Sequence, residues 1–339
     1  MKDNRSASSN SENRPRVIWQ TGGRLHLYSL FYVSPNQRNH SNLRGTVDDI
    51  GIFLGCASLL AKSARYHGIR FSLITNDIDL VGARLNAIDA AEHVDLVCHK
   101  FERNVPHGIE FYSAHFKLDL FQAFGSGAFG DWIGLIDLDM VLLRPIPEWV
   151  FQKTGLLAYG ISDQVFPEYG RETVVRDLER IAGCSISAPT WYGGEFLLGQ
   201  SGAFQRLAGY VERCWPAYLR NIEALHHVGD EMVVSSSLAL AQGNCELVTD
   251  AGSIGLVSRW WTARTGFVQM PLHLASTACV LHLPADKRFL AAQSRRPFHP
   301  GDFLSSYKSY ARKKLLVRKL YNSTLGVFER QRRFVGSIS

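Results

Sequence analysis

The sequence lacks the features that mark a membrane-spanning protein or one exported by a signal peptide. No run of about 18 apolar residues, the length needed to cross a bilayer, occurs in the 339 residues. Residues 1–15 are polar and contain no apolar h-region, so we interpret them as a disordered leader and not as a signal peptide. These absences favour a cytoplasmic protein whose only membrane association is peripheral, on the inner face of the membrane.

Cysteine is scarce and shows no metal-binding or redox spacing. The six cysteines include no CxxC pair, and most lie within apolar segments. This pattern predicts buried free thiols in a reducing compartment and argues against a zinc site built from cysteine. The six are Cys56, Cys98, Cys184, Cys214, Cys245 and Cys279.

Positive charge exceeds negative charge, and much of the excess lies near the C-terminus. The formal net charge is +6, which predicts an anionic partner. Residues 305–334 contain many Lys and Arg residues, interspersed apolar residues and a single acid, Glu329. Two interpretations stay open: a surface helix resting on an anionic membrane, or a solvated tail helix packed on the domain. No nucleic-acid-binding motif is recognisable, so nucleic acid is not an expected partner.

The hydrophobic patterns alternate between those of strands and those of helices. Such βαβ organisation predicts an α/β protein with a Rossmann-type, mixed and mainly parallel sheet covered by helices on both faces. Its ligands are expected beyond the carboxyl ends of the strands. The predicted elements are strands over 16–21, 69–77 and 94–101, a strand within 134–146 that carries Asp137 and Asp139, and helices over 47–68, 80–93 and 113–124.

The stretch GLIDLDMVLLRPI (134–146) places two acids, Asp137 and Asp139, at the end of an apolar strand. Burying an ionised carboxylate is costly unless it is paired or binds a metal. Residues i and i+2 of a strand point to the same side, so the two acids can share one ion. Carboxylate oxygens suit Mg²⁺, Mn²⁺ or Ca²⁺, which also bind substrate phosphates.

This arrangement resembles the DxD signature of nucleotide-sugar glycosyltransferases with the GT-A fold. The segment FYSAHFKLDLFQAF resembles the helix before that motif in glycogenin-like and lipopolysaccharide hexosyltransferases, with Lys117 where a basic residue faces the nucleotide. WYGGEFLLG (191–199) is similar to the small-residue turn and strand that shapes the sugar pocket, which implies that Gly193 and Gly194 contact the donor.

Two further segments extend the resemblance toward the C-terminus. IEALHHVGDEMVVSS is similar to the region of the blood-group A/B transferase family in which an Asp-Glu pair serves the donor sugar, which implies catalytic roles for Asp230 and Glu231. VLHLPADKRFL resembles the element in which a His completes the metal shell and a Lys binds the diphosphate, here His282 and Lys287. The plainer interpretations are that Asp230 and Glu231 start a helix and that His282 is a core histidine.

The resemblance implies a hexosyltransferase with a GT-A domain over 16–300 and a basic helical tail over 301–339. Mn²⁺ or Mg²⁺ would be its cofactor, a UDP-sugar its donor and a glycan or lipid-linked molecule its acceptor, with retention of configuration. By fold analogy, Thr21 and Asp77 lie at strand ends where the nucleotide base and ribose are expected.

Two other classes of protein remain open. LIDLDMV also fits haloacid-dehalogenase-like phosphatases, with Asp137 as nucleophile and Asp139 as acid/base, although that motif normally opens its domain. A non-catalytic, sugar-binding protein at a membrane surface would need the basic tail but not the two acids.

Overall fold

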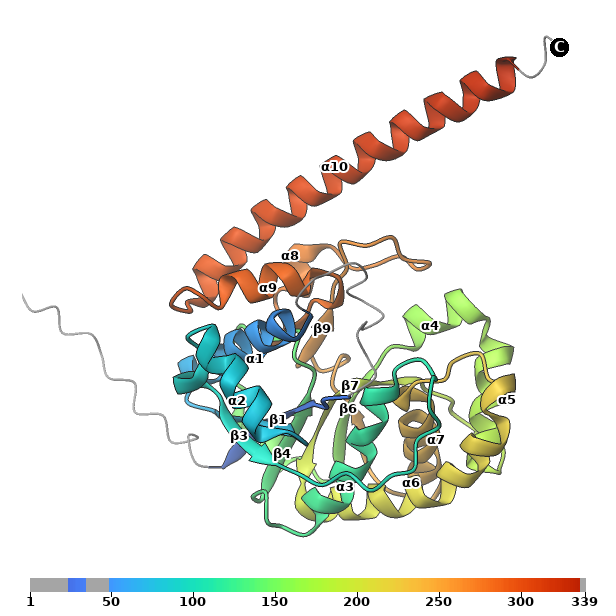
Figure 1. Cartoon of the computed structure of the whole chain (residues 1–339). Coiled ribbons are helices and arrows are strands. Elements are labelled where there is room, and N and C mark those ends of the chain that lie inside the picture. Colours follow the sequence, from blue (N-terminus) through green and yellow to red (C-terminus); the bar gives the residue numbers. More distant parts are fainter. Residues whose placement is uncertain (1–23, 35–48, 336–339) are drawn as a thin grey trace, which may run out of the picture.

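The protein is a mixed α/β structure built on a seven-stranded sheet (Figure 1). The computed structural model describes residues 24–34 and 49–335, with the backbone alone for 320–335. The strand order is β3-β2-β1-β4-β7-β6-β8, and β7 runs antiparallel to both of its neighbours whereas the other pairs are parallel. The strands are β1 (Leu25–Phe31), β2 (Arg70–Thr75), β3 (Asp95–Cys98), β4 (Trp132–Ile136), β6 (Leu156–Gly160), β7 (Tyr192–Gln200) and β8 (Val248–Asp250).

Helices cover both faces of this sheet, as the sequence predicted. One face carries α1 (Asp49–Tyr66) and α2 (Ile78–Ala87), and α9 (Lys287–Gln293) packs against α1. The other face carries α3 (Lys117–Gly125), α6 (Ser201–Asn221) and α7 (Asp230–Gly243). Further helices are α4 (Ser162–Tyr169), α5 (Arg171–Ala182) and α8 (Leu272–Ala275), with 3₁₀ turns at Ala91–His93, Tyr112–Phe116, Glu148–Gln152, Ile222–Ala224 and Pro284–Asp286.

A second, three-stranded sheet lies beside the carboxyl end of β4. Its order is β5-β10-β9, formed by β5 (Met140–Leu142), β10 (Val280–His282) and β9 (Val257–Arg259). β10 is antiparallel to β5 and parallel to β9. Two strands from the C-terminal third of the chain, β9 and β10, thereby form one sheet with β5, the strand that follows Asp137 and Asp139.

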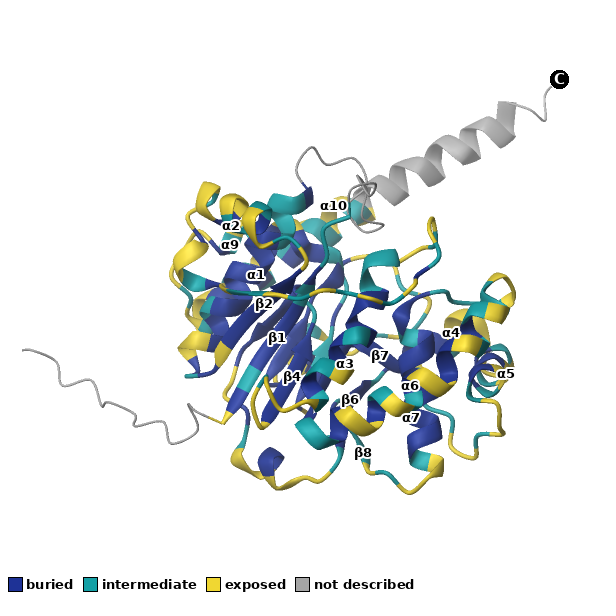
Figure 2. Ribbon diagram, turned by 60° about the horizontal axis from the view of Figure 1, so that its bottom comes forward, coloured by how far each residue is buried: buried dark blue, intermediate teal, exposed yellow. Residues whose placement is uncertain are grey.

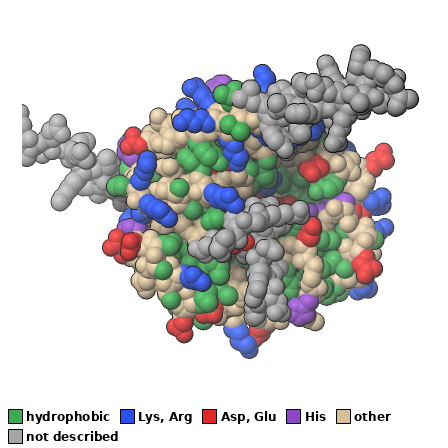
Figure 3. Space-filling model, turned by 45° about the horizontal axis from the view of Figure 1, so that its top comes forward, with side chains coloured by type: hydrophobic (Ala, Val, Ile, Leu, Met, Phe, Trp, Pro, Cys, Tyr) green, Lys and Arg blue, Asp and Glu red, His purple; other side chains and the backbone are tan. Residues whose placement is uncertain are grey.

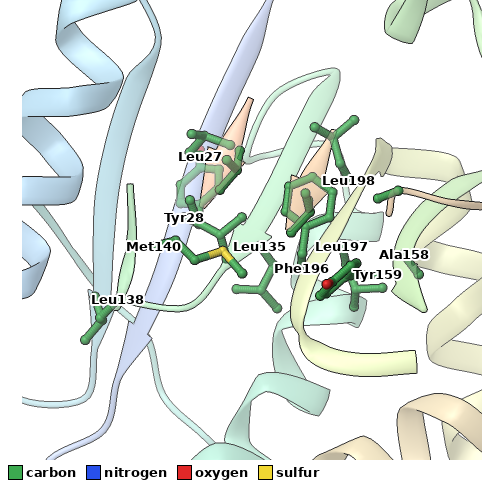
Figure 4. Packing of buried hydrophobic residues seen from close by; sticks show 14 of the residues in the cluster. Leu27, Tyr28, Leu135, Leu138, Met140, Ala158, Tyr159, Phe196, Leu197 and Leu198 are labelled. Carbon is green, nitrogen blue, oxygen red and sulfur yellow. The ribbon is translucent and has the colours of Figure 1, made fainter. Parts of the chain in front are cut away.

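The core follows from the burial of the central strands on both faces. Every residue of β4 is buried, as expected for a strand with helices above and below it (Figure 2). Side chains of β1, β4, β6 and β7 form one apolar cluster, including Leu27, Leu135, Phe196 and Leu198 (Figure 4). Gly134 of β4 leaves room for a neighbouring strand, because a Cβ there would lie 2.5 Å from a methyl carbon of Leu27 and would displace that buried side chain.

The first described strand is not the one that the sequence predicted. β1 spans Leu25–Phe31, whereas the strand predicted over 16–21 lies outside the described residues, as does the predicted leader over 1–15. Polar residues within β1 make this strand difficult to recognise from its hydrophobic pattern. In the structure, these residues form hydrogen bonds with neighbouring strands. His26 Nε2 lies 2.8 Å from Ser72 Oγ, and the Ser29 hydroxyl donates to the Ile136 carbonyl at 2.6 Å.

The long C-terminal helix α10 (Pro300–Val335) is anchored to the body of the protein by its first turns. Phe303, Tyr307 and Ala311 are buried. Two basic residues of the segment also face inward: Lys314 Nζ lies 2.7 Å from the buried Asp286 carboxylate, and Arg318 donates to a backbone carbonyl. No helix in the described part of the chain is long and apolar enough to cross a membrane.

Candidate active site

The main sheet contains a point at which the strand order reverses. β2 and β3 lie on one side of β1, whereas β4, the next strand along the chain, lies on its other side. In open α/β sheets, ligands bind beyond the carboxyl ends of the strands at such a point. Asp137 directly follows β4, so we take it as the starting residue of the candidate site.

Asp137, Asp139 and His282 converge at this position. One potential ligand atom from each lies within 4.8 Å of those of the other two, so the three residues could bind one metal ion. The small sheet brings them together, because His282 pairs with Met140, the residue after Asp139. The Leu283 N–H donates to the Asp139 carbonyl at 3.0 Å and extends this pairing by one residue.

The donor set fits a divalent cation. His282 is 3% exposed and Asp139 4% exposed, so neither is an ordinary surface group. His282 Nε2 lies 3.0 Å from Asp139 Oδ1, which places an imidazole nitrogen beside a carboxylate oxygen. Two carboxylates and one imidazole nitrogen suit ions of the Mn²⁺ type, and such a site leaves positions for substrate oxygens.

Two buried lysines flank the three potential ligands. Lys117 is the first residue of α3, and its Nζ lies 2.6 Å from Asp137 Oδ1. Lys287 is the first residue of α9, and its Nζ contacts Asp139 Oδ2. The resemblance implied that Lys117 faces the nucleotide and that Lys287 binds the diphosphate. They place two positive charges beside the two acids.

The two acids of the DxD segment have different electrostatic environments. Burial raises the pKa of Asp137, and the nearby Asp139 charge adds to this effect although Lys117 opposes it. Burial also disfavours the charged form of Asp139, but Lys287 and His282 outweigh it and hold the pKa of Asp139 well below its usual range. Asp139 is therefore ionised at neutral pH.

Asp230 and Glu231 begin helix α7, and they also lie at the site. Asp230 Oδ2 is 3.5 Å from Lys117 Nζ, which connects it to the DxD segment. Glu231 Oε2 accepts a hydrogen bond from Trp191 Nε1 at 3.2 Å, and its Oε1 lies 4.0 Å from Arg259. Burial and the neighbouring Glu195 charge raise the pKa of Glu231 to about 7.

Gly193 and Gly194 do not form the predicted turn, because both lie inside strand β7. They provide room for carboxylates instead. A Cβ on Gly193 would lie 1.6 Å from Glu195 Oε2, and a Cβ on Gly194 would lie 2.3 Å from Asp230 Oδ2. Any side chain at either position would displace an acid of the site.

The sequence interpretation missed Glu195 and Arg259, which lie between Glu231 and the three potential metal ligands, here called the candidate metal triad. Glu195 is 1% exposed and its carboxylate contacts the Arg259 guanidinium. The signal for Glu195 was present, because a charged residue inside an apolar strand needs a partner, as for Asp137. Arg259 gave no local signal, because its place depends on the pairing of β9 with His282 in β10.

Other predicted residues lie elsewhere or have structural partners. Asp77 follows β2 and caps α2, since its Oδ1 accepts from the Leu80 N–H at 2.9 Å. Thr21 lies outside the described residues. The expectation that most cysteines are buried is wrong, because half of them, Cys98, Cys184 and Cys245, are exposed loop or strand-end residues. All six thiols are free.

Comparisons with known proteins leave this geometry as the basis for assigning a function. No protein-family model matches the chain, and the search of curated proteins finds no significant match.

Proposed function

We propose that the protein is a metal-dependent glycosyltransferase of the GT-A type. It would transfer a hexose from a UDP-sugar to a glycan or lipid-linked acceptor with retention of configuration. The observation that carries this proposal is the grouping of Asp137, Asp139 and His282 between two buried lysines at the sheet's switch point. A divalent cation held by the paired acids, together with the two lysines, would suit a diphosphate better than a neutral ligand.

The leaving diphosphate is the part of the reaction that needs positive charge. Mn²⁺ or Mg²⁺, held by Asp137, Asp139 and His282, would neutralise the charge that develops as the diphosphate leaves. Lys117 and Lys287 would add two ammonium groups on either side of the diphosphate.

Glu231 is the proposed nucleophile or stabilising carboxylate for the sugar. Its side chain is 26% exposed, so it can reach a bound ligand, whereas Asp230 beside it is buried. An ionised carboxylate can stabilise an oxocarbenium-like centre or bond to it transiently. The Trp191 hydrogen bond orients Glu231, and Asp230 would position the donor sugar.

The outer side of α10 supports an acceptor at a membrane surface. Arg312, Lys313 and Lys319 are exposed, and Leu316 and Val317 are 59% and 65% exposed. Basic and apolar side chains on one exposed helix favour anionic lipid headgroups. We propose that this surface binds the inner face of a membrane and that the acceptor is lipid-linked.

Calorimetric titration of UDP, with Mn²⁺ or with chelator, tests the proposed function. We expect binding that needs Mn²⁺ and is lost in the Asp137→Asn/Asp139→Asn variant, because the ion can no longer connect protein and diphosphate. Asp131→Asn, an exposed residue just before the other end of β4, is the matched control and should bind like wild type. Turnover of UDP-sugars would then be screened.

Other outcomes point to the other classes of protein. Absence of UDP and GDP binding with metal present, together with release of phosphate from phosphomonoesters, would favour the phosphatase with Asp137 as nucleophile. Sugar-nucleotide binding with neither transfer nor hydrolysis would favour a non-catalytic protein.

A further inference from the structure

Glu195 is a buried acid of the site to which the proposed reaction gives no role. Its side chain is 1% exposed, so it cannot contact a substrate directly. One oxygen, Oε1, contacts the Arg259 guanidinium and also lies 3.6 Å from His282 Nδ1. The other oxygen, Oε2, has no hydrogen-bond partner among the described residues. The Arg259 guanidinium and the His282 ring therefore both lie beside a single oxygen of this carboxylate.

The His282 ring lies between two carboxylates. Its Nε2 faces Asp139 Oδ1 at 3.0 Å, and its Nδ1 faces Glu195. A neutral imidazole has one N–H, and without a cation the closer Asp139 favours the proton on Nε2. A cation bound by Asp137 and Asp139 would displace that proton, and the Glu195 carboxylate beside Nδ1 then favours the Nδ1–H form. The Nε2 lone pair is then left for the cation that Asp137 and Asp139 would bind.

Arg259 lies between Glu195 and a second carboxylate. Its guanidinium contacts Glu195 directly, whereas Glu231 Oε1 lies 4.0 Å away. Because Glu195 has the closer contact, it restrains the guanidinium and leaves Glu231 with only a long ion pair to Arg259, at 4.0 Å. Glu231 then stays available to a ligand.

The backbone beside Glu195 leaves space for this carboxylate. Gly193 lies on the same side of β7, and a Cβ there would lie 1.6 Å from Oε2. A side chain at 193 would push the carboxylate away from His282 or Arg259. The Gly-Gly-Glu segment is thus suited to holding one acid in one place.

We propose that Glu195 is a positioning residue that links the metal site to Glu231. It orients His282 for the cation through Nδ1, and it keeps Arg259 from pairing closely with Glu231. This inference rests on the proposed function, because it assumes that Asp137, Asp139 and His282 bind a metal ion.

The test measures Mn²⁺ affinity by electron paramagnetic resonance of free Mn²⁺, with UDP present, in wild type and Glu195→Gln. Loss of a residue that orients a metal ligand typically weakens binding by about 10–100-fold, and we expect a loss in that range. Asp177→Asn is the matched control, since Asp177 is another buried acid paired with a histidine, His226, outside the candidate metal triad. It should leave Mn²⁺ affinity unchanged. Equal affinity in Glu195→Gln and wild type would overturn the proposal.

A double-mutant cycle separates positioning from general damage. If Glu195 acts through His282, Glu195→Gln should have little further effect on Mn²⁺ affinity in a His282→Asn background. Independent, additive losses in the two variants would contradict a role through His282.

Histidine tautomers provide a readout that needs no Glu195 variant and that applies even if Glu195→Gln does not fold. In ¹⁵N-histidine-labelled wild type with Mg²⁺ and UDP, the resonance missing from His282→Asn identifies His282. We expect the Nδ1–H form, and an Nε2–H form would overturn the proposal. If wild type and Asp137→Asn/Asp139→Asn show the same Mn²⁺ binding or none, the proposed function itself fails.

Discussion

At the scale of single residues, Glu231 is an acid whose neighbours set when it is ionised. Burial and the charge of Glu195 raise its pKa to about 7, and Arg259 lowers it. Asp230 on the same helix also raises this pKa, and the Trp191 hydrogen bond lowers it. His227 and Tyr169 are the other titratable groups near it.

A pH profile of kcat with a saturating UDP-sugar follows from this environment. Protonation would remove the negative charge that the proposed role of Glu231 requires, so kcat should fall as the pH drops below about 7. In the Glu195→Gln variant, the fall of kcat on the acidic side of the pH profile should move to lower pH, because removal of a negative neighbour lowers the pKa of Glu231. An acidic limb that stays in place in this variant would show that another group controls it.

The residues that were predictable share one property, which is charge inside an apolar segment. Asp137 and Asp139 interrupt a strand pattern, and that is visible without any structure. Glu195 has the same property, but the glycines before it suggested a turn and drew attention away from it. Arg259 could not be found, because its position depends on strand pairing between distant segments.

At the scale of elements, the helices and strands over residues 49–98 follow their hydrophobic patterns. The candidate site also depends on the three strands of the small sheet, which have no recognisable pattern. β5, β9 and β10 are three residues long, too short for any periodicity to stand out. Their pairing is set by contacts between distant parts of the chain. Local sequence patterns therefore predicted the α/β class but not the small sheet.

Helix α10 is attached to the site by one buried acid. Asp286 is 1% exposed and accepts hydrogen bonds from the Tyr307 hydroxyl at 2.8 Å, the Tyr310 hydroxyl at 3.1 Å and the Thr262 hydroxyl at 2.7 Å. The next residue is Lys287, which contacts Asp139. The anchor of α10 therefore also supports a lysine of the proposed diphosphate site.

Replacing this acid should loosen the helix. We expect Asp286→Ala to lower the free energy of unfolding in urea by about 2–4 kcal/mol, because buried hydroxyls and Lys314 lose their acceptor. Hydrogen exchange over residues 303–314 should become faster. Asp302→Ala, which changes an acid of α10 whose side chain is 89% exposed, is the control and should stay within about 0.5 kcal/mol of wild type. Equal stability of the two variants would refute the anchoring role.

At the scale of the whole molecule, the basic segment has both an inner and an outer side. The view in Figure 3 looks onto the side that bears α9 and α10 and shows Lys and Arg side chains spread over the described surface. Tyr307, Tyr310 and Lys314 face the body, so truncation at residue 305 would damage the fold as well as remove charge. Substitution of the outer residues is the cleaner experiment.

Binding to vesicles of phosphatidylcholine and phosphatidylglycerol tests the outer side. Changing Arg312, Lys313 and Lys319 to Gln should weaken binding by about 1 kcal/mol per residue, roughly 100-fold in total. The control removes three exposed charges from other helices, Arg84, Arg213 and Arg220, and should bind like wild type. Cosedimentation at low and high salt measures both, and equal binding of the two triple variants would rule out docking through α10.

The pairing of β5 with β10 has a consequence for the order in which the molecule acquires its site. Asp137, Asp139 and Lys117 are synthesised well before His282 and Lys287. Until β10 emerges from the ribosome, the segment after β4 has neither its strand partner nor two of the side chains that surround its acids. The proposed metal affinity would thus be acquired late in synthesis, and a nascent chain that stalls before residue 280 would contain most of the main sheet and yet be unable to assemble the proposed metal site.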